Sequence, residues 1–161
     1  MIELLTASME IPEEANIVVG QAHFIKTVED IYEAVVTTAP HAKFGLAFNE
    51  SSGACLTRTE GNDPLLRDVA IRNAQMLAAG HVFVLMIRNA YPINLLNALR
   101  HVPEVVSIFC ATANPVEVVL AVSGQGRGVL GVIDGSSPKG VEDEAGVAWR
   151  HDSLRRFGYK R

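Results

Sequence analysis

Val82 to Ile87 is the longest unbroken run of apolar side chains in the sequence. A run of this length that is rich in β-branched and aromatic residues, and that ends in a polar residue such as Arg88, is typical of a strand buried on both faces. His81 precedes the run directly and follows Gly80. The run therefore predicts a central strand with a titratable side chain at its entrance, where an α/β domain can keep a reactive group.

The composition describes one globular domain. The chain has 161 residues, of which 48% are hydrophobic, so it can build a core and is not a disordered segment. The formal net charge of −4 argues against a general nucleic-acid binder. No stretch approaches the roughly 18 apolar residues of a membrane span, and the N-terminus lacks the pattern of a secretion signal. We expect a single domain over residues 1–161, located in the cytoplasm, without membrane or nucleic-acid partners.

The two cysteines favour the same location. Cys55 and Cys110 fall in expected strands and form no CxxC pair, which suits a reducing compartment. A small buried thiol is the favoured interpretation of Cys55, and a nucleophile is the alternative.

Helical spacing and turn residues predict three helices. The first opens at Lys26-Thr27, with a capping box formed by Thr27 and Asp30, and ends before Pro40. The second has Asp63 as its N-cap and a C-terminal glycine at position 80. The third covers residues 92–99.

Strands outnumber these helices. We expect strands over residues 2–8, 16–22, 43–48, 54–59, 82–87, 105–111, 116–122 and 128–133. Residues 134–146 are glycine-rich and acidic and are interpreted as a loop, and residues 149–161 as a short basic C-terminal tail. The predicted class is α+β, with one largely antiparallel sheet, a strand–helix–strand unit and about three covering helices.

The strand–helix–strand unit from residue 54 to residue 88 places one loop near His81. Such a crossover makes its two strands parallel, so both strands start at the same edge of the sheet. The hairpin loop 49–53 leads into the first of them, and its Asn49, Glu50, Ser51 and Ser52 should then lie at the His81 edge. This expectation requires that the two strands be neighbours.

Two kinds of candidate site follow from the residues. His81 can act as a nucleophile or base with Glu50 on its other ring nitrogen; the alternative is a histidine that only caps the sheet edge. The stretch from Ser123 through Gln125, Gly126 and Arg127 to Gly128 can offer backbone N–H groups and a guanidinium to a phosphate; the alternative is a mobile hairpin turn.

The remaining polar features are weaker candidates. Asp134 lies in a turn, with magnesium binding as a lesser alternative. The tail mixes cations with aromatic residues and either docks on a neighbouring subunit, stays loose, or contacts RNA. The other histidines lack metal-ligand spacing, so we expect no structural zinc.

Four blocks of the chain carry a family resemblance. They are Asn16–Val36 (NIVVGQAHFIKTVEDIYEAVV), Lys43–Asp63 (KFGLAFNESSGACLTRTEGND), Gly80–Val84 (GHVFV) and Ser123–Gly135 (SGQGRGVLGVIDG). With them the chain resembles the adenosine-specific kinase family, a small prokaryotic family first described as a domain of unknown function. The resemblance covers nearly the whole chain, and its motifs do not resemble mainstream kinase signatures.

The resemblance implies an adenosine-binding protein that moves a phosphoryl group from ATP to the nucleoside, with Mg²⁺ accompanying the ATP. It also implies a histidine that can carry the phosphoryl group and a compact homo-oligomer with the site between subunits. The matching histidine is His81 in GHVFV.

The residues themselves suggest which groups would help. Lys43, Asn49, Arg58 and the Ser123–Gly128 backbone are candidate contacts for the nucleotide. The C-terminal end of the preceding helix opposes a phosphate at His81, and cations from another chain could offset this effect. Because no known kinase motif is present, a nucleotide- or nucleoside-sensing protein without turnover is the alternative function.

Overall fold

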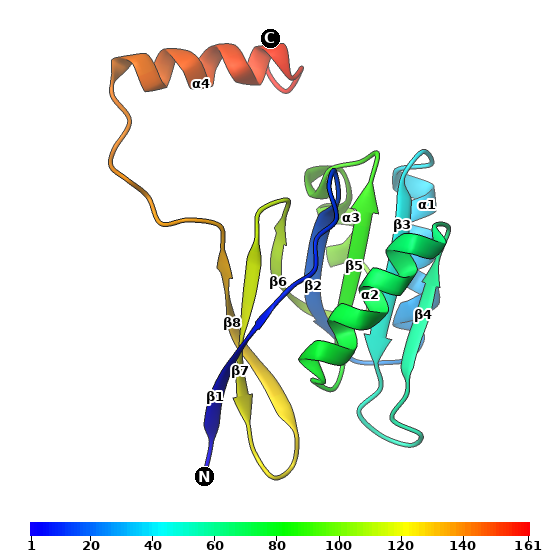
Figure 1. The fold of residues 1–161 in the computed structure, drawn as a ribbon. Helices are drawn as coiled ribbons and strands as arrows, with labels where there is room; N and C mark the ends of the chain where they lie inside the picture. The colour runs from blue at the N-terminus through cyan, green and yellow to red at the C-terminus, as the bar shows by residue number, and fades with distance from the viewer.

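The computed structural model describes residues 1–161, and Figure 1 shows its fold. Helices and strands are mixed along the chain, which confirms the α+β class. The strands are β1 (Glu3–Ser8), β2 (Asn16–Ala22), β3 (Lys43–Asn49), β4 (Thr57–Gly61), β5 (Val82–Arg88), β6 (Val105–Thr112), β7 (Val116–Val122) and β8 (Arg127–Asp134). The helices are α1 (Thr27–Thr38), α2 (Pro64–Leu77), α3 (Pro92–Arg100) and α4 (Glu144–Arg156).

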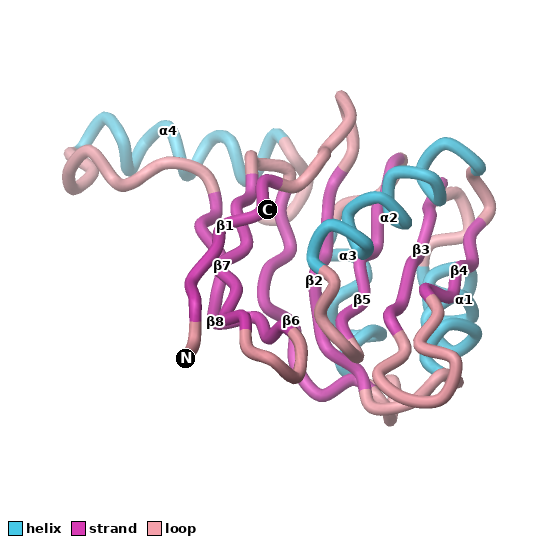
Figure 2. The backbone as a smooth tube through the Cα atoms, turned by 60° about the horizontal axis from the view of Figure 1, so that its bottom comes forward, coloured by secondary structure: helices cyan, strands magenta, loops and turns pink.

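The apolar run forms the central strand, as predicted. The larger sheet, here the main sheet, has the order β4-β3-β5-β2-β6, and every neighbouring pair is antiparallel. All residues from Val82 to Ile87 are buried, because helices cover both faces of this sheet (Figure 2).

A second sheet separates from the first, whereas the sequence predicted a single sheet. This small sheet has the order β1-β7-β8 and is also antiparallel. After β6 the chain turns through Pro115, which has no N–H to extend the ladder, and β7 pairs with β1 instead of returning beside β6.

Two apolar cores lie on the two faces of the main sheet. α1 and α3 pack on one face, where Phe83 and Leu95 belong to the same core. α2 packs on the other face together with the small sheet, and Leu66 and Leu120 belong to that second core. The main sheet is therefore held from both sides, which fixes the position of the residues at its ends.

The start of α1 differs from the predicted capping box. Lys26 is the N-cap residue, and no side chain caps this end. The Thr27 hydroxyl donates to the carbonyl of Phe24, and the Asp30 carboxylate pairs with the Lys26 ammonium. The predicted capping box does not form, because the Thr27 hydroxyl and the Asp30 carboxylate bond to these other groups.

The structure confirms the predicted start of α2 but not its predicted end. At its start the Asp63 carboxylate accepts a hydrogen bond from the Leu66 N–H at 3.0 Å, which confirms the predicted N-cap. At its end the left-handed residue is Ala78, with a φ of 49°, and not Gly80. Gly80 is needed for a different reason, because a Cβ there would lie 2.6 Å from the Cβ of Ser51.

The C-terminal residues form a helix that the sequence analysis did not predict. Asp143 caps α4 by accepting a hydrogen bond from the Gly146 N–H at 2.8 Å, so the expected loop ends there and most of the basic tail is helical. Figure 1 shows α4 apart from both sheets, at the end of the extended segment 135–143. No helix of the structure combines the length and the apolar composition that crossing a bilayer requires.

Candidate functional site

One end of the main sheet brings together the segments that the sequence singled out. We call this end, at which β5 begins, the His81 edge; it comprises residues 22–23, 49–56, 78–81 and 104. The His81 N–H donates to the Asn49 carbonyl at 2.7 Å, and the His81 carbonyl accepts from the Ala22 N–H at 2.9 Å. The loop after β3 therefore lies beside His81, as expected. The reason is different, because β3 and not β4 is the neighbour of β5.

His81 is held by backbone geometry and by two rings. Its φ of 62° is in the left-handed region, which is uncommon for a residue with a side chain. Its ring stacks on Phe48, with the centroids 5.8 Å apart and the planes 18° apart. The His23 ring meets it edge-on, with the centroids 6.2 Å apart. The imidazole is half-buried and has a defined position while it keeps access to solvent.

Glu50 is engaged with partners other than His81. One carboxylate oxygen accepts from the Leu56 N–H at 2.8 Å, and the other accepts from the Arg58 Nε at 2.8 Å. The Leu56 N–H and then the Arg58 guanidinium lower the pKa of the Glu50 carboxyl. Glu50 and Arg58 are thus brought to the edge as an ion pair that holds the loop closed.

Asn49 supports the edge from inside. Its side-chain amide donates to the carbonyls of Ala74 at 2.8 Å and Ala79 at 3.1 Å, and its oxygen accepts from the Thr57 hydroxyl at 2.8 Å. These bonds use both amide hydrogens. The Asn49 side chain therefore has no free N–H to donate to a nucleotide, whereas the sequence analysis predicted such a contact. Asn49 instead ties the C-terminal end of α2 to β3.

We expect Asn49→Asp to lower the free energy of unfolding by about 2 kcal/mol, because a carboxylate would face two carbonyl oxygens at a helix C-terminus. Denaturant unfolding followed by circular dichroism measures the change. Asn94→Asp is the matched control, since Asn94 is exposed, uses only its oxygen toward the Tyr91 N–H and lies at a helix N-terminus. Equal stability of the two variants would contradict this role of Asn49.

A cleft of about 630 Å³ lies between the His81 edge and the hairpin that joins β7 to β8. Glu50, Ser51 and Gly80 line one wall. The opposite wall contains all the residues predicted to contact phosphate in this hairpin, namely Ser123, Gln125, Gly126, Arg127 and Gly128. The structure therefore brings the predicted loop to the residue that precedes His81, although the His81 side chain does not line the cleft.

Arg127 offsets the negative C-terminal end of α2, which would otherwise oppose a phosphate near His81. Its Nη1 donates to the Met76 carbonyl, in the last turn of α2, at 3.3 Å. A cation at this position neutralises the negative end of the helix dipole. The offsetting charge therefore comes from the same chain. The other N–H groups of the guanidinium make no hydrogen bond in the chain and can contact an anion in the cleft.

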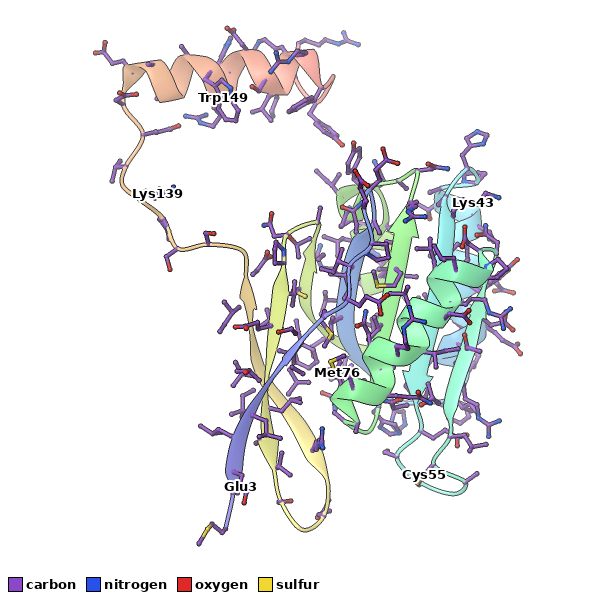
Figure 3. All side chains as sticks on the ribbon, in the orientation of Figure 1. Glu3, Lys43, Cys55, Met76, Lys139 and Trp149 are labelled. Atoms are coloured by element: carbon purple, nitrogen blue, oxygen red, sulfur yellow. The ribbon has the colours of Figure 1, made fainter.

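Two predicted site residues lie at the opposite end of the main sheet. Lys43 starts β3 opposite Arg88, at the end of β5, and Figure 3 shows Lys43 and Cys55 toward opposite ends of the main sheet. The Asp134 carboxylate accepts from the Thr112 hydroxyl at 2.9 Å and from the Asn114 amide at 3.0 Å. Neither residue reaches the cleft at the His81 edge. No three His, Cys, Asp or Glu side chains come together as a metal-binding group.

Cys55 lies in this cleft and is exposed, whereas the sequence favoured a buried thiol in a strand. The strand begins only at Thr57, because residues 52–54 turn and Cys55 has a φ of 52°. Cys110 is buried, and this burial raises the pKa of its thiol to about 11.

We expect iodoacetamide at pH 8 to alkylate Cys55 within minutes and to leave Cys110 unmodified in the folded chain. The thiolate is the reacting form, and with a pKa near 11 only about one Cys110 thiol in a thousand is ionised at this pH. Mass spectrometry of the digested protein measures both sites, and denatured protein is the control. Equal alkylation of both cysteines before unfolding would contradict the described burial.

The sequence analysis missed His23 and Phe48 as neighbours of the site. His23 directly follows β2, and that position was visible in the sequence. The antiparallel pairing of β2 with β5, which brings His23 beside His81, was not. The predicted placement of Ser51 at this edge is confirmed, because Ser51 approaches Gly80 closely.

The fold and this edge define an α+β domain with a cleft that is lined by an arginine and by a glycine-rich hairpin. The family model described as adenosine specific kinase matches residues 7–160. The chain therefore belongs to the adenosine-specific kinase family, which confirms the resemblance seen in the sequence blocks.

A solved structure agrees with this assignment. The chain is similar to the PH1918 protein from Pyrococcus horikoshii OT3, whose crystal structure superimposes with a TM-score of 0.96 at 40% sequence identity. The match covers 100% of this chain and 99% of that chain. No match was found among curated proteins.

Proposed function

We propose that this chain binds adenosine and Mg-ATP and transfers the γ-phosphoryl group to the nucleoside through a phosphohistidine at His81. Membership of the adenosine-specific kinase family supports the substrate and the reaction class. The observation that carries the site is the position of His81, which is half-buried, fixed between two rings and adjacent to the residue that lines the cleft.

The reaction proceeds in two displacements. A neutral nitrogen of His81 attacks the γ-phosphorus, the bond to the β,γ-bridging oxygen breaks, and ADP leaves. The 5′-hydroxyl of adenosine then attacks the same phosphorus and the phosphorus–nitrogen bond breaks. The ring leaves as neutral imidazole because its other nitrogen is protonated, and the proton of the hydroxyl passes to water. The products are AMP and ADP.

The cleft would position the phosphates for this chemistry. Phosphoryl transfer needs alignment and charge neutralisation more than covalent work by the protein. Arg127 and the backbone N–H groups of the Ser123–Gly128 hairpin supply donors on one wall, and Ser51 supplies a hydroxyl on the other. Mg²⁺ enters as part of the Mg-ATP substrate.

The alternative function is nucleoside sensing without turnover. The ion pair of Glu50 with Arg58 favours it, because this pair leaves no carboxylate bonded to the His81 ring. A chain that only senses the nucleoside would bind adenosine and leave it unchanged.

Multiple-turnover assays separate the two functions. The chain is incubated with adenosine, ATP and Mg²⁺, and AMP is measured by chromatography beyond one equivalent per chain. AMP that accumulates linearly over many turnovers supports the kinase. Bound adenosine that remains unchanged after long incubation would overturn the kinase in favour of the sensor.

We propose further that the chain self-associates through α4, in line with the homo-oligomer that the family resemblance implies. Trp149 is 68% exposed and Phe157 is 65% exposed on this helix, which stands apart from the sheets. Light scattering of the full chain should give a multiple of the chain mass that Trp149→Glu reduces. A monomeric wild-type chain at high concentration would contradict this assembly.

A further inference from the structure

A second cleft lies at the end of the main sheet opposite the His81 edge. It has a volume of about 800 Å³, and we call it the far-end cleft. Its walls come from the segment 9–15 before β2, from Asn16 at the start of β2, from the segment 89–91 after β5 and from the turn 113–115 between the sheets. β5 separates it from His81, and at about 3.3 Å per residue this strand of 7 residues spans roughly 20 Å.

Asn16 gives this cleft a fixed polar group. The residue is only 6% exposed, and its amide nitrogen donates to the Ala90 carbonyl at 3.3 Å. The amide oxygen accepts no hydrogen bond from the chain, and it is not completely buried. Because Asn16 lines the cleft, its amide oxygen can accept a hydrogen bond from a ligand or from water there.

The charges around the cleft discriminate against anions. Glu13 and Glu14 both line it, and no lysine or arginine side chain does. Arg88 lies nearby, but its guanidinium is turned to the Glu13 carbonyl, with donor distances of 3.2 Å and 3.0 Å. A phosphate in this cleft would meet negative charge, whereas sugar hydroxyls would find carboxylate acceptors.

The rest of the lining suits a flat ring. The Tyr91 side chain stands at the cleft with 64% of its surface exposed, and Met9, Ile11 and Pro12 add apolar surface. Aromatic side chains stack on nucleobases. The Asn16 oxygen can accept from an amino group such as the one that adenine carries.

We propose that the far-end cleft is a second nucleoside site that takes a neutral purine nucleoside and rejects its phosphorylated forms. The choice of adenosine as the nucleoside rests on the proposed function. A nucleoside held here is out of reach of His81 in the same chain, so the cleft senses the acceptor of the reaction and does not process it.

Photolabelling with 8-azidoadenosine tests this site in the full chain. Trypsin releases residues 89–100, which contain Tyr91, as one peptide, and residues 73–88, which contain His81, as another. We expect label in peptide 89–100 that excess adenosine removes and excess AMP does not. Tyr91→Leu should reduce this label at least about tenfold, as the loss of a stacked base implies. Tyr159→Leu, at an exposed aromatic residue near the C-terminus, should leave it unchanged.

The outcomes separate this inference from the proposed function. His81→Ala should keep the label in peptide 89–100 while it abolishes phosphoryl transfer. Absence of adenosine-protected label from peptide 89–100, or equal protection by AMP and adenosine, would overturn the second site even if AMP is produced normally. Label in peptide 89–100 from a chain that makes no AMP would uphold the second site and overturn the kinase.

Discussion

Replacing His81 with alanine is expected to lower the rate of AMP formation by roughly a thousandfold or more. Loss of the nucleophile removes the covalent intermediate, and removal of a single nucleophile can cost as much as removal of a whole catalytic group. The His81 backbone bonds to Asn49 and Ala22 do not depend on the side chain, so the edge keeps its shape. Steady-state assays with saturating adenosine and Mg-ATP measure the change.

His41→Ala is the matched control for this experiment. His41 is exposed and precedes β3, at the far end of the main sheet, so its loss should leave the rate within about twofold of wild type. Thermal unfolding of both variants shows whether either change acts through stability. A His81→Ala chain that is folded and retains a tenth of the wild-type rate would contradict the covalent mechanism.

Replacing Gly45 with alanine is expected to lower the free energy of unfolding by about 3 kcal/mol or more. Gly45 lies in β3 under the first turn of α2, and a Cβ there would be 2.1 Å from the backbone nitrogen of Arg67 and 2.2 Å from the carbonyl carbon of Leu66. Because these are backbone atoms, no side-chain rotation relieves the overlap and the helix must move away from the sheet. Denaturant unfolding with a two-state fit measures the loss.

Gly131→Ala is the control for the glycine prediction. Gly131 is also a strand residue, in β8, but no atom lies within 4 Å of a Cβ placed there. We expect its unfolding free energy to change by less than about 0.5 kcal/mol. If Gly45→Ala were as stable as Gly131→Ala, the close packing of α2 on β3 would be wrong.

Much of the main sheet could be predicted from local sequence signals. The run from Val82 to Ile87 identified the central strand because a doubly buried strand needs no polar side chain. Asp63 identified the start of α2 because its carboxylate meets an unpaired N–H. The strand–helix–strand unit placed the hairpin loop after β3 at the His81 edge, although the strand that pairs with β5 is β3 and not β4.

The rest depended on contacts between distant segments. The small sheet forms because β7 pairs with β1, more than a hundred residues away in the chain, and no local pattern specifies that partner. The same holds for His23, which reaches His81 through strand pairing. Lys43 was misplaced because its charge suggested a phosphate contact, while the antiparallel order of β3 and β5 carries it to the other end of the sheet.

The hydrogen-bond partners of the side chains at the His81 edge also differ from the prediction, because other groups in the chain compete for them. Glu50 looked like a partner for His81, but the Leu56 N–H and the Arg58 guanidinium are closer and occupy both of its oxygens. Asn49 looked like a ligand contact, but the carbonyls at the end of α2 take both of its amide hydrogens. Both side chains pair with partners in the chain before they can contact a ligand, and these partners could not be identified from the sequence.

The central claim is that His81 carries the phosphoryl group, and the most direct measurement is covalent labelling by γ-labelled ATP in the absence of adenosine. The account predicts label that is stable in base and lost in acid, that maps to the tryptic peptide 73–88, and that adenosine discharges as labelled AMP. It also predicts no label on His81→Ala. An unlabelled wild-type chain, or undiminished label on His81→Ala, would contradict the account.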